Sequence, residues 1–245
     1  MATLNPTQGP SSGGNSVVIT GTNFTGATSV KFGNKSASFT VNSPTQITAI
    51  APSGNGVVGV TVTTPGGTTS PVNYFYVPQP IKTALSNTSG PLTGATTTIT
   101  GANLSTASSV SFGTVGSVTP TVVNDNTITV TAPTSATAQT VPITVTTKGG
   151  STNGLFFSYV AGPTTSGINP ASGPEAGGTA STITGTGLSD TTSVTYGTAS
   201  AAFVVNSDTE LIAYAPPGTG TVTVNVTTPG GTDSTQTFTY VPPPT

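Results

Sequence analysis

The chain has 245 residues, of which only 4% are charged, with a formal net charge of −2, no cysteine and no histidine. Its four cations are all lysine, so it lacks the arginine forks and the basic surface that nucleic-acid binding requires. The missing cysteines exclude disulfides and thiolate chemistry, and no run of about 18 apolar residues predicts a membrane span. We expect no nucleic-acid partner, no membrane insertion and no cofactor.

The first segment that predicts structure is TGTNFTGATSVKFG, which begins at Thr20. It returns without a gap as TGANLSTASSVSFG from Thr100 and as TGTGLSDTTSVTYG from Thr184. Gly-Pro dipeptides and a Thr-Pro-Gly-Gly or Thr-Lys-Gly-Gly motif recur with the same period of 81 to 83 residues. A period of this size is that of a small domain. We therefore predict three tandem domains, over residues 1–78, 79–162 and 163–245.

Apolar and polar residues alternate within each repeat, as they do in strands with one buried face. No stretch shows a convincing helical period, and Gly, Pro, Asn and Asp punctuate the chain about every 8 to 12 residues. The sequence therefore predicts an all-β protein made of three tandem immunoglobulin-like β-sandwiches. The matching inward positions include Val58, Val60 and Val62 in the first repeat, Val141, Ile143 and Val145 in the second, and Val222, Val224 and Val226 in the third.

Short linkers rich in Pro or Gly join the repeats, VPQPIKTAL from Val77 and VAGPTTSGI from Val160. They have equal lengths, and proline restricts the backbone, so we expect semi-rigid spacers and a semi-extended rod. The chain ends in VPPPT, which reads as the start of another such linker.

The thrice-repeated segment is typical of a strand, a turn and a second strand that close one end of a sandwich. Ile19 ends the first strand facing inward, and Gly21 marks a backbone position that a side chain would crowd. Phe24, replaced by Leu104 and Leu188 in the other repeats, is then expected to plug the open end of the core.

The spacing P-x-x-G-P-x-x-G-G, followed after four residues by I-T-G-x-x-F, resembles the IPT/TIG (immunoglobulin-like, plexin, transcription factor) domain family. The resemblance covers all three repeats. The second repeat departs from the pattern, with Asn87 for the proline and Ala95 for the second glycine, so its first turn is expected to differ. The pattern is carried in the first repeat by Pro6, Gly9, Pro10, Gly13, Gly14, Ile19, Gly21 and Phe24, and in the third by Pro170, Gly173, Pro174, Gly177, Gly178, Ile183, Gly185 and Leu188.

This resemblance implies an immunoglobulin-like fold and leaves the function open, because a fold does not define a function. Similar domains occur in bacterial surface proteins, phage virion proteins, plexin-type receptors, Rel-type transcription factors and accessory modules of starch-active enzymes.

One stretch, GPSSG from Gly9 to Gly13, matches the G-x-S-x-G nucleophile elbow and would make Ser11 a nucleophile. The chain offers no histidine to act as its base, and the equivalent stretches read GPLTG and GPEAG. Histidine, cysteine and arginine supply most of the bases, nucleophiles and charge-stabilising groups of enzymes, and this chain has none of them. We therefore expect a turn here, no catalytic residue and no enzymatic activity.

Asp208 and Glu210 could be paired carboxylates for acid–base chemistry or ligands of a calcium ion. A calcium ion is usually bound by six to eight oxygen atoms, several of them from carboxylates. The other two repeats have no such pair of acidic residues at the equivalent positions. Asp and Asn are also common in turns because their side chains bond the nearby backbone. The sequence favours the turn and predicts no metal site.

Three aromatic residues break the repeat pattern and should face outward by alternation, namely Phe75, Phe156 and Tyr214. They could pack against a linker or a neighbouring repeat, form a contact surface for another subunit, or form a platform for sugars. The chain has no tryptophan, the residue most often used to stack on sugars.

Charge is distributed unevenly along the chain. Repeat 1 has Lys31 and Lys35 and no acid, which gives +2, and repeat 2 has two lysines and one aspartate, which gives +1. Repeat 3 has five acids and no base, which gives −5. A surface with so few charges favours association, and opposite ends favour contact between repeat 1 of one copy and repeat 3 of another.

The sequence thus predicts a non-enzymatic structural or adhesive component of a bacterial surface appendage or a phage particle, which acts through protein–protein contacts and self-association. The candidate contact residues are Phe75, Phe156, Tyr214, Lys31 and Lys35. The alternative is an accessory module that binds a surface glycan. We expect an extracellular, cell-surface or virion location, with no signal peptide in this chain, because Leu4 already belongs to the first repeat.

Overall fold

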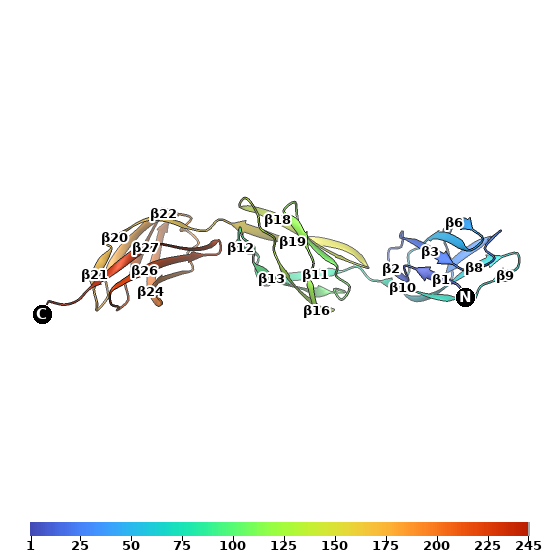
Figure 1. The fold of residues 1–245 in the computed structure, drawn as a ribbon, viewed down its shortest axis with the longest axis horizontal. Helices are drawn as coiled ribbons and strands as arrows, with labels where there is room; N and C mark the ends of the chain where they lie inside the picture. Colours follow the sequence, from blue (N-terminus) through green and yellow to red (C-terminus); the bar gives the residue numbers. More distant parts are fainter. Residues whose placement is uncertain (245) are drawn as a thin grey trace. The chain divides into compact units, whose positions relative to one another are not determined.

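The structure is a computed structural model that describes residues 1–244, and every regular element in that range is a β-strand (Figure 1). The strands of repeat 1 are β1 (Thr3–Asn5), β2 (Gln8–Pro10), β3 (Ser16–Thr20), β4 (Ser29–Phe32), β5 (Lys35–Ser36), β6 (Ser38–Ser43), β7 (Gln46–Ile50), β8 (Gly56–Thr64), β9 (Gly67–Thr68) and β10 (Val72–Val77). Those of repeat 2 are β11 (Ile81–Leu85), β12 (Ser89–Pro91), β13 (Thr96–Ala102), β14 (Ser109–Phe112), β15 (Gly116–Val118), β16 (Thr121–Asn124), β17 (Thr127–Thr131), β18 (Gln139–Thr147) and β19 (Gly150–Val160). Those of repeat 3 are β20 (Thr164–Asn169), β21 (Ser172–Pro174), β22 (Ala180–Thr186), β23 (Ser193–Tyr196), β24 (Ala199–Ser207), β25 (Glu210–Tyr214), β26 (Thr221–Thr228) and β27 (Gly231–Val241).

Each repeat is a sandwich with immunoglobulin-like strand order. In repeat 1, one sheet runs β1-β3-β7-β6 and the other β2-β10-β8-β4-β5, and the short strand β9 also pairs with β8. The strand β2 pairs with β10 in parallel, whereas the other pairs are antiparallel. This order corresponds to the ABED and CFG sheets of an immunoglobulin domain, so the predicted fold class is confirmed.

Repeats 2 and 3 follow the same order, with one difference in repeat 3. There a single long strand, β24, pairs with β23 at one end and with β25 at the other, which joins the two sheets into one path. A strand that passes from one sheet to the other in this way forms a corner of the sandwich.

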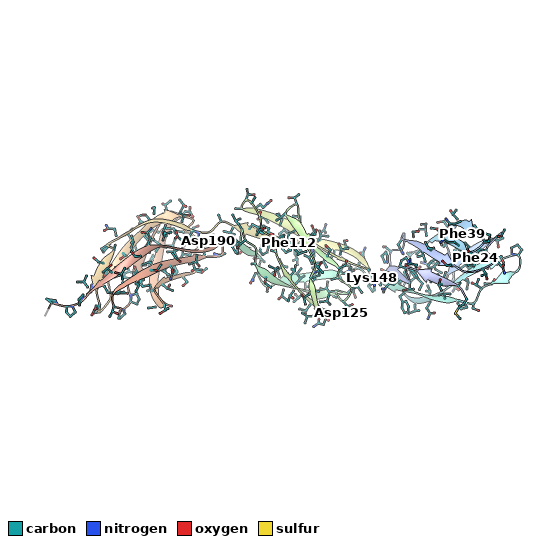
Figure 2. The ribbon with its side chains drawn as sticks, in the orientation of Figure 1. Phe24, Phe39, Phe112, Asp125, Lys148 and Asp190 are labelled. Carbon is teal, nitrogen blue, oxygen red and sulfur yellow. The ribbon has the colours of Figure 1, made fainter. Side chains whose placement is uncertain are left out.

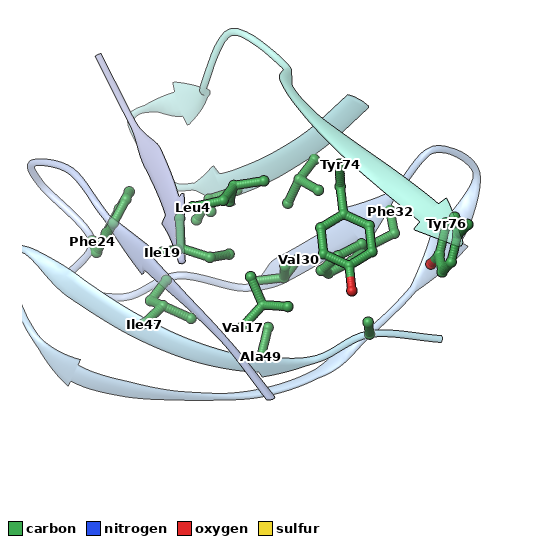
Figure 3. Packing of buried hydrophobic residues seen from close by; sticks show 13 residues of the cluster. Leu4, Val17, Ile19, Phe24, Val30, Phe32, Ile47, Ala49, Tyr74 and Tyr76 are labelled. Carbon is green, nitrogen blue, oxygen red and sulfur yellow. The ribbon is translucent and has the colours of Figure 1, made fainter. Parts of the chain in front are cut away.

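The alternating apolar positions form the core that the sequence predicts. In repeat 1 the rings of Phe32 and Tyr74 meet edge to face at 5.1 Å, and the Tyr74 hydroxyl bonds the amide of Asn15. Figure 3 shows Phe24 at one end of this core and Tyr76 at the other. Because buried tyrosine hydroxyls need partners, Tyr76 donates to the carbonyl of Pro52 at 2.7 Å.

The thrice-repeated segment closes one end of the sandwich, as predicted. Phe24, Leu104 and Leu188 are all fully buried. A Cβ at Gly21 would lie 2.5 Å from the Phe24 ring, and one at Gly101 would lie 1.8 Å from the carbonyl oxygen of Ile81. Both distances are far below van der Waals contact, so only glycine fits.

The first turn of repeat 2 differs, as expected, but by a deletion and not by the substitution that the sequence comparison indicated. Ala95 accepts a hydrogen bond from the Ala132 N–H at 2.9 Å, as Asn15 does from the Ala51 N–H at 3.0 Å. Ala95 therefore occupies the position of Asn15, and the residue missing from this turn is the second glycine. Gly14 has φ +86°, a conformation that alanine rarely adopts, so the shorter turn avoids it.

Candidate contact surface

The three aromatic residues that break the repeat pattern are exposed, in agreement with the alternation. Phe75, Phe156 and Tyr214 expose 45%, 57% and 43% of their surface. Phe75 lies on β10 and Phe156 on β19, in equivalent sheets of repeats 1 and 2, whereas Tyr214 lies on β25 in the opposite type of sheet. Each repeat therefore carries one of these side chains, and no repeat collects them into a cluster.

Phe75 and Tyr214 have different neighbours across their strands. Phe75 pairs with Val57 on β8, which is 56% exposed, so the two side chains form a small apolar patch. Tyr214 lies between Ala180 on β22 and Ala202 on β24. The short alanine side chains on both sides leave the tyrosine ring raised above the sheet.

The two lysines of repeat 1 lie on one hairpin but face opposite sides of its sheet. Lys35 pairs with Phe32, a core residue, whereas Lys31 pairs with Ser36, and cross-strand partners share a face. The Lys35 ammonium donates to the carbonyl oxygen of Ser53 at 2.7 Å. Lys31 is thus the lysine of this pair that points outward from the sandwich.

The carboxylate of Asp208 holds a loop and is not paired for acid–base chemistry. It accepts hydrogen bonds from the Gly187 N–H at 3.2 Å and the Ser189 hydroxyl at 3.0 Å, and these bonds lower the pKa of Asp208. Glu210 accepts from the Asn206 amide instead. Within residues 1–244 no three acidic, histidine or cysteine side chains are grouped so that they could hold a metal ion.

Asp125 in repeat 2 is equivalent to Asp208 in repeat 3 and also holds a loop through hydrogen bonds. It lies in the turn after β16 (Figure 2) and accepts from the Ser105 hydroxyl at 2.7 Å and from the N–H groups of Ser105 and Asn103. These hydrogen bonds lower the pKa of Asp125. The equivalent position in repeat 1 is Pro44, whose carbonyl accepts from the Phe24 N–H.

Ser11 lies in a turn, as expected. Its N–H donates to the carbonyl of Val77 at 2.9 Å, and its own carbonyl accepts from the Gly54 N–H at 2.9 Å. Both bonds use the backbone and fix the turn after β2. Neither bond involves the Ser11 hydroxyl.

Two polar groups were missed by the sequence reasoning, a half-buried lysine and a buried threonine, and both lie near the closed end of their sandwiches. Lys82 on β11 donates to the carbonyl of Ile143, and burial lowers its pKa to about 8. Thr165 holds the same register position in repeat 3, where its hydroxyl and N–H donate to Asp233. No charge pattern marks these positions, because each pairs with a group distant in the sequence.

The sequence reasoning also missed the contacts that the linkers make. The first linker packs against the Thr-x-Gly-Gly turn of repeat 2, where it buries Gly149. The equivalent Gly230 of repeat 3 is buried against the second linker. The recurrence of two adjacent glycines at this place is the signal that could have revealed these contacts.

The domain architecture defines a tandem immunoglobulin-like protein, and the family follows from the comparison with known domains. The model of the "IPT/TIG domain" matches residues 1–76, 80–159 and 163–240. The chain therefore belongs to the IPT/TIG domain family, in agreement with the resemblance seen in the sequence. No curated protein matches the chain.

Solved structures share low identity with the chain. The plexin A4 extracellular region is 20% identical, with a TM-score of 0.45 over 99% of this chain and 24% of that one. The Escherichia coli adhesin FdeC is 15% identical, with a TM-score of 0.37 over 99% of this chain and 96% of that one. The Bacteroides ovatus protein SGBP-B, in complex with a mixed-linkage heptasaccharide, is 20% identical, with a TM-score of 0.31 over 96% of this chain and 65% of that one. The chain spans about a quarter of the plexin chain. Among residues 1–244 no helix is long and apolar enough to cross a membrane.

Proposed function

We propose that the protein is a non-enzymatic structural or adhesive component of a bacterial surface appendage or phage particle, located outside the cell or on a virion. It acts through protein–protein contacts, including contacts between its own copies. The observation that carries this proposal is the exposure of one large aromatic side chain per repeat on a surface with very few charges. Apolar groups on such a surface favour association, because little electrostatic repulsion opposes it.

The internal roles of the polar groups support a non-enzymatic function. Asp125, Asp208 and Asp233 each accept several hydrogen bonds that hold loops or strands together. Ser11 has no histidine anywhere in the chain to activate it. These three carboxylates thus stabilise the fold.

A carbohydrate-binding module is the second candidate, and one observation favours it. The Tyr214 ring stands between two alanines on the outer face of its sheet, an arrangement that would let a sugar stack on the aromatic face. Phe75 lies between Val57 on β8 and Gln8 on β2, and its exposed ring could act in the same way.

Self-association and glycan binding can be distinguished by a biosensor experiment in which either the protein itself or a glycan is passed over the immobilised chain. We expect a saturable biosensor signal when the chain itself is injected, and none with xyloglucan, mixed-linkage glucan or starch. The signal should fall when Phe75→Ala or Tyr214→Ala chains are injected, whereas Asn34→Ala, in an exposed turn, should leave it unchanged. Saturable glycan binding that Tyr214→Ala abolishes would instead establish the second candidate.

A further inference from the structure

The outer face of one sheet of repeat 3 is apolar. Tyr214 on β25 lies between Ala180 on β22 and Ala202 on β24. Ile212, two positions before Tyr214, lies beside Val204 on β24, and Val204 is 52% exposed. Because alternate residues of a strand share one side of the sheet, these side chains form one patch. We call this patch the repeat 3 face, made of Ala180, Ala202, Val204, Ile212 and Tyr214.

The fold does not need apolar side chains at these positions, because the other repeats carry mostly hydroxyl groups there. In repeat 2 the hydroxyls of Thr96 and Thr131, which stand in place of Ala180 and Tyr214, bond each other at 3.0 Å. An exposed apolar patch that the fold itself does not require indicates a contact site. The equivalent residues are Ser16, Ser38, Thr40, Thr48 and Ile50 in repeat 1, and Thr96, Thr121, Thr129 and Thr131 in repeat 2.

A second apolar pair lies on the outer face of the other type of sheet in repeat 1. Val57 and Phe75 are cross-strand partners, and both are exposed. In repeat 2 the hydroxyls of the equivalent Thr140 and Ser158 bond each other at 2.8 Å. A pair of threonines does the same in repeat 3. The fold therefore does not require this apolar pair either.

A lysine lies on the same face as this pair. Lys31 on β4 pairs with Thr61 on β8, and Thr61 lies four positions along that strand from Val57. Four positions of a strand span about 13 Å. We call the surface made of Lys31, Val57 and Phe75 the repeat 1 face.

The repeat 3 face has an acid at the corresponding spacing. Glu210 lies on β25 four positions from Tyr214 and on the same side of the strand, so about 13 Å separate the two residues. Its side chain is partly exposed beside the apolar patch. The two faces thus carry opposite charges at matching distances along their strands from their apolar groups.

We propose that the repeat 3 face of one copy packs on the repeat 1 face of a second copy, with Tyr214 against Phe75 and Glu210 beside Lys31. This inference rests on the proposed self-association and names the two surfaces that produce it. Packed sheet faces lie about 10 Å apart, so their side chains meet in one layer. Burial of the apolar groups drives this contact, and the opposite charges determine which faces meet.

Charge distinguishes this pairing from its alternatives. Two repeat 3 faces would bring two Glu210 carboxylates together between repeats that each carry −5. Repeat 2 also has an outward aromatic residue, Phe156, on the equivalent sheet, but Ser111 stands there in place of Lys31. Repeat 1, which carries +2, is therefore the partner. A contact between unlike faces leaves one face of each kind open, so it continues into chains of copies.

The experiment is sedimentation velocity over a range of concentrations on the full chain with one charge reversed. We expect Lys31→Glu and Glu210→Lys each to associate at least about tenfold more weakly than the wild type, because like charges then meet at the contact. The matched controls are Lys35→Glu and Glu175→Lys, which make the same changes of net charge in the same repeats but outside the two faces. Both controls should associate like the wild type.

A mixture of the two charge variants tests the pairing itself. In an equimolar mixture of Lys31→Glu with Glu210→Lys, every contact between unlike variants again joins an acid to a base. We therefore expect the mixture to associate like the wild type, although each variant alone does not.

A second set of variants tests the aromatic side chains by giving each position a residue that another repeat carries there. Tyr214→Thr and Phe75→Ser introduce the residues of repeat 2, so their melting temperatures should stay close to that of the wild type. Each should associate about tenfold more weakly. Their mixture should form a dimer of one copy each and nothing larger, because each variant keeps one intact face. Ile50→Thr and Phe156→Asn, which change exposed apolar side chains outside the two faces, are the controls and should associate like the wild type.

The outcomes separate this inference from the proposed function. If Lys31→Glu associates like Lys35→Glu, or if the mixture of charge variants does not recover association, the pairing of the two faces is wrong and self-association stands through another surface. If Phe156→Asn weakens association and Phe75→Ser does not, the contact uses repeat 2 and the pairing is again wrong. If the wild type stays monomeric at every concentration, both the pairing and the proposed self-association are wrong.

Discussion

Replacement of Asp233 by alanine is expected to destabilise repeat 3 by about 2 kcal/mol. The Asp233 carboxylate is buried and accepts hydrogen bonds from the N–H and hydroxyl of Thr165 and from the Thr235 N–H. These bonds join β20 to β27, so the substitution leaves buried donors unpaired at the start of the repeat. Hydrogen exchange followed by mass spectrometry should show faster exchange in the peptide of β20. Asp190→Ala, which removes an exposed carboxylate from the same repeat, is the matched control and should change exchange little.

The Asp233 contribution should depend on pH with a defined sign. Burial raises the pKa of Asp233, but the hydrogen bonds from Thr165 and Thr235 outweigh burial, and the net pKa is lowered. A lowered pKa stabilises the fold above the unfolded value of about 3.9, and this contribution is lost as the pH falls through the folded value. The difference between wild type and Asp233→Ala should therefore shrink below about pH 4. A difference that is as large below about pH 4 as it is at neutral pH would contradict the role of the ionised carboxylate.

Phe24→Ala should have the largest effect on stability, about 3–5 kcal/mol in repeat 1. Phe24 is fully buried and plugs the end of the core, so its loss leaves a cavity beside Gly21. Trypsin offers a local readout, because Lys31 and Lys35 lie within repeat 1 and repeat 3 contains no lysine or arginine. A short trypsin pulse in increasing urea should cut Phe24→Ala at these lysines at much lower urea than the wild type.

Phe75→Ala is the matched control for this prediction. It makes the same chemical change in the same repeat, but Phe75 is 45% exposed, so the cost should be about 0.5 kcal/mol. Equal sensitivity of the two variants to trypsin would contradict the assignment of Phe24 as the plug.

The fold could be predicted from the sequence because its determinants are local and repeated. Alternation placed Val60 and Val62 in the core, and glycine at a fixed offset marked Gly21, which no side chain could replace. The deletion before Ala95 was interpreted as a substitution, although Ile99 follows Gly90 by nine positions and Ile19 follows Gly9 by ten. Strand alternation thus shows which side chains face inward, but it does not show how many residues a turn contains.

The candidate surface was only partly predictable. Alternation identified Phe75 and Tyr214 as outward, since it depends only on the strand. It could not show that Lys31 and Lys35 face opposite sides, because that depends on the register of the β4–β5 hairpin. The linker contacts with Gly149 were missed because the recurring pair of glycines was interpreted as turn chemistry alone, although a carbonyl also lies on the first of them.

Sedimentation velocity of the wild-type chain, over a range of concentrations at low and at high salt, tests the central claim most directly. The account predicts a sedimentation coefficient that rises with concentration, because copies associate through their own surfaces. The rise should be smaller at high salt, since the attraction between a repeat of charge +2 and one of charge −5 is screened beyond about 8 Å at physiological ionic strength. A single monomeric species at every concentration and at both salt levels would contradict the claim that this protein acts through contacts between its copies.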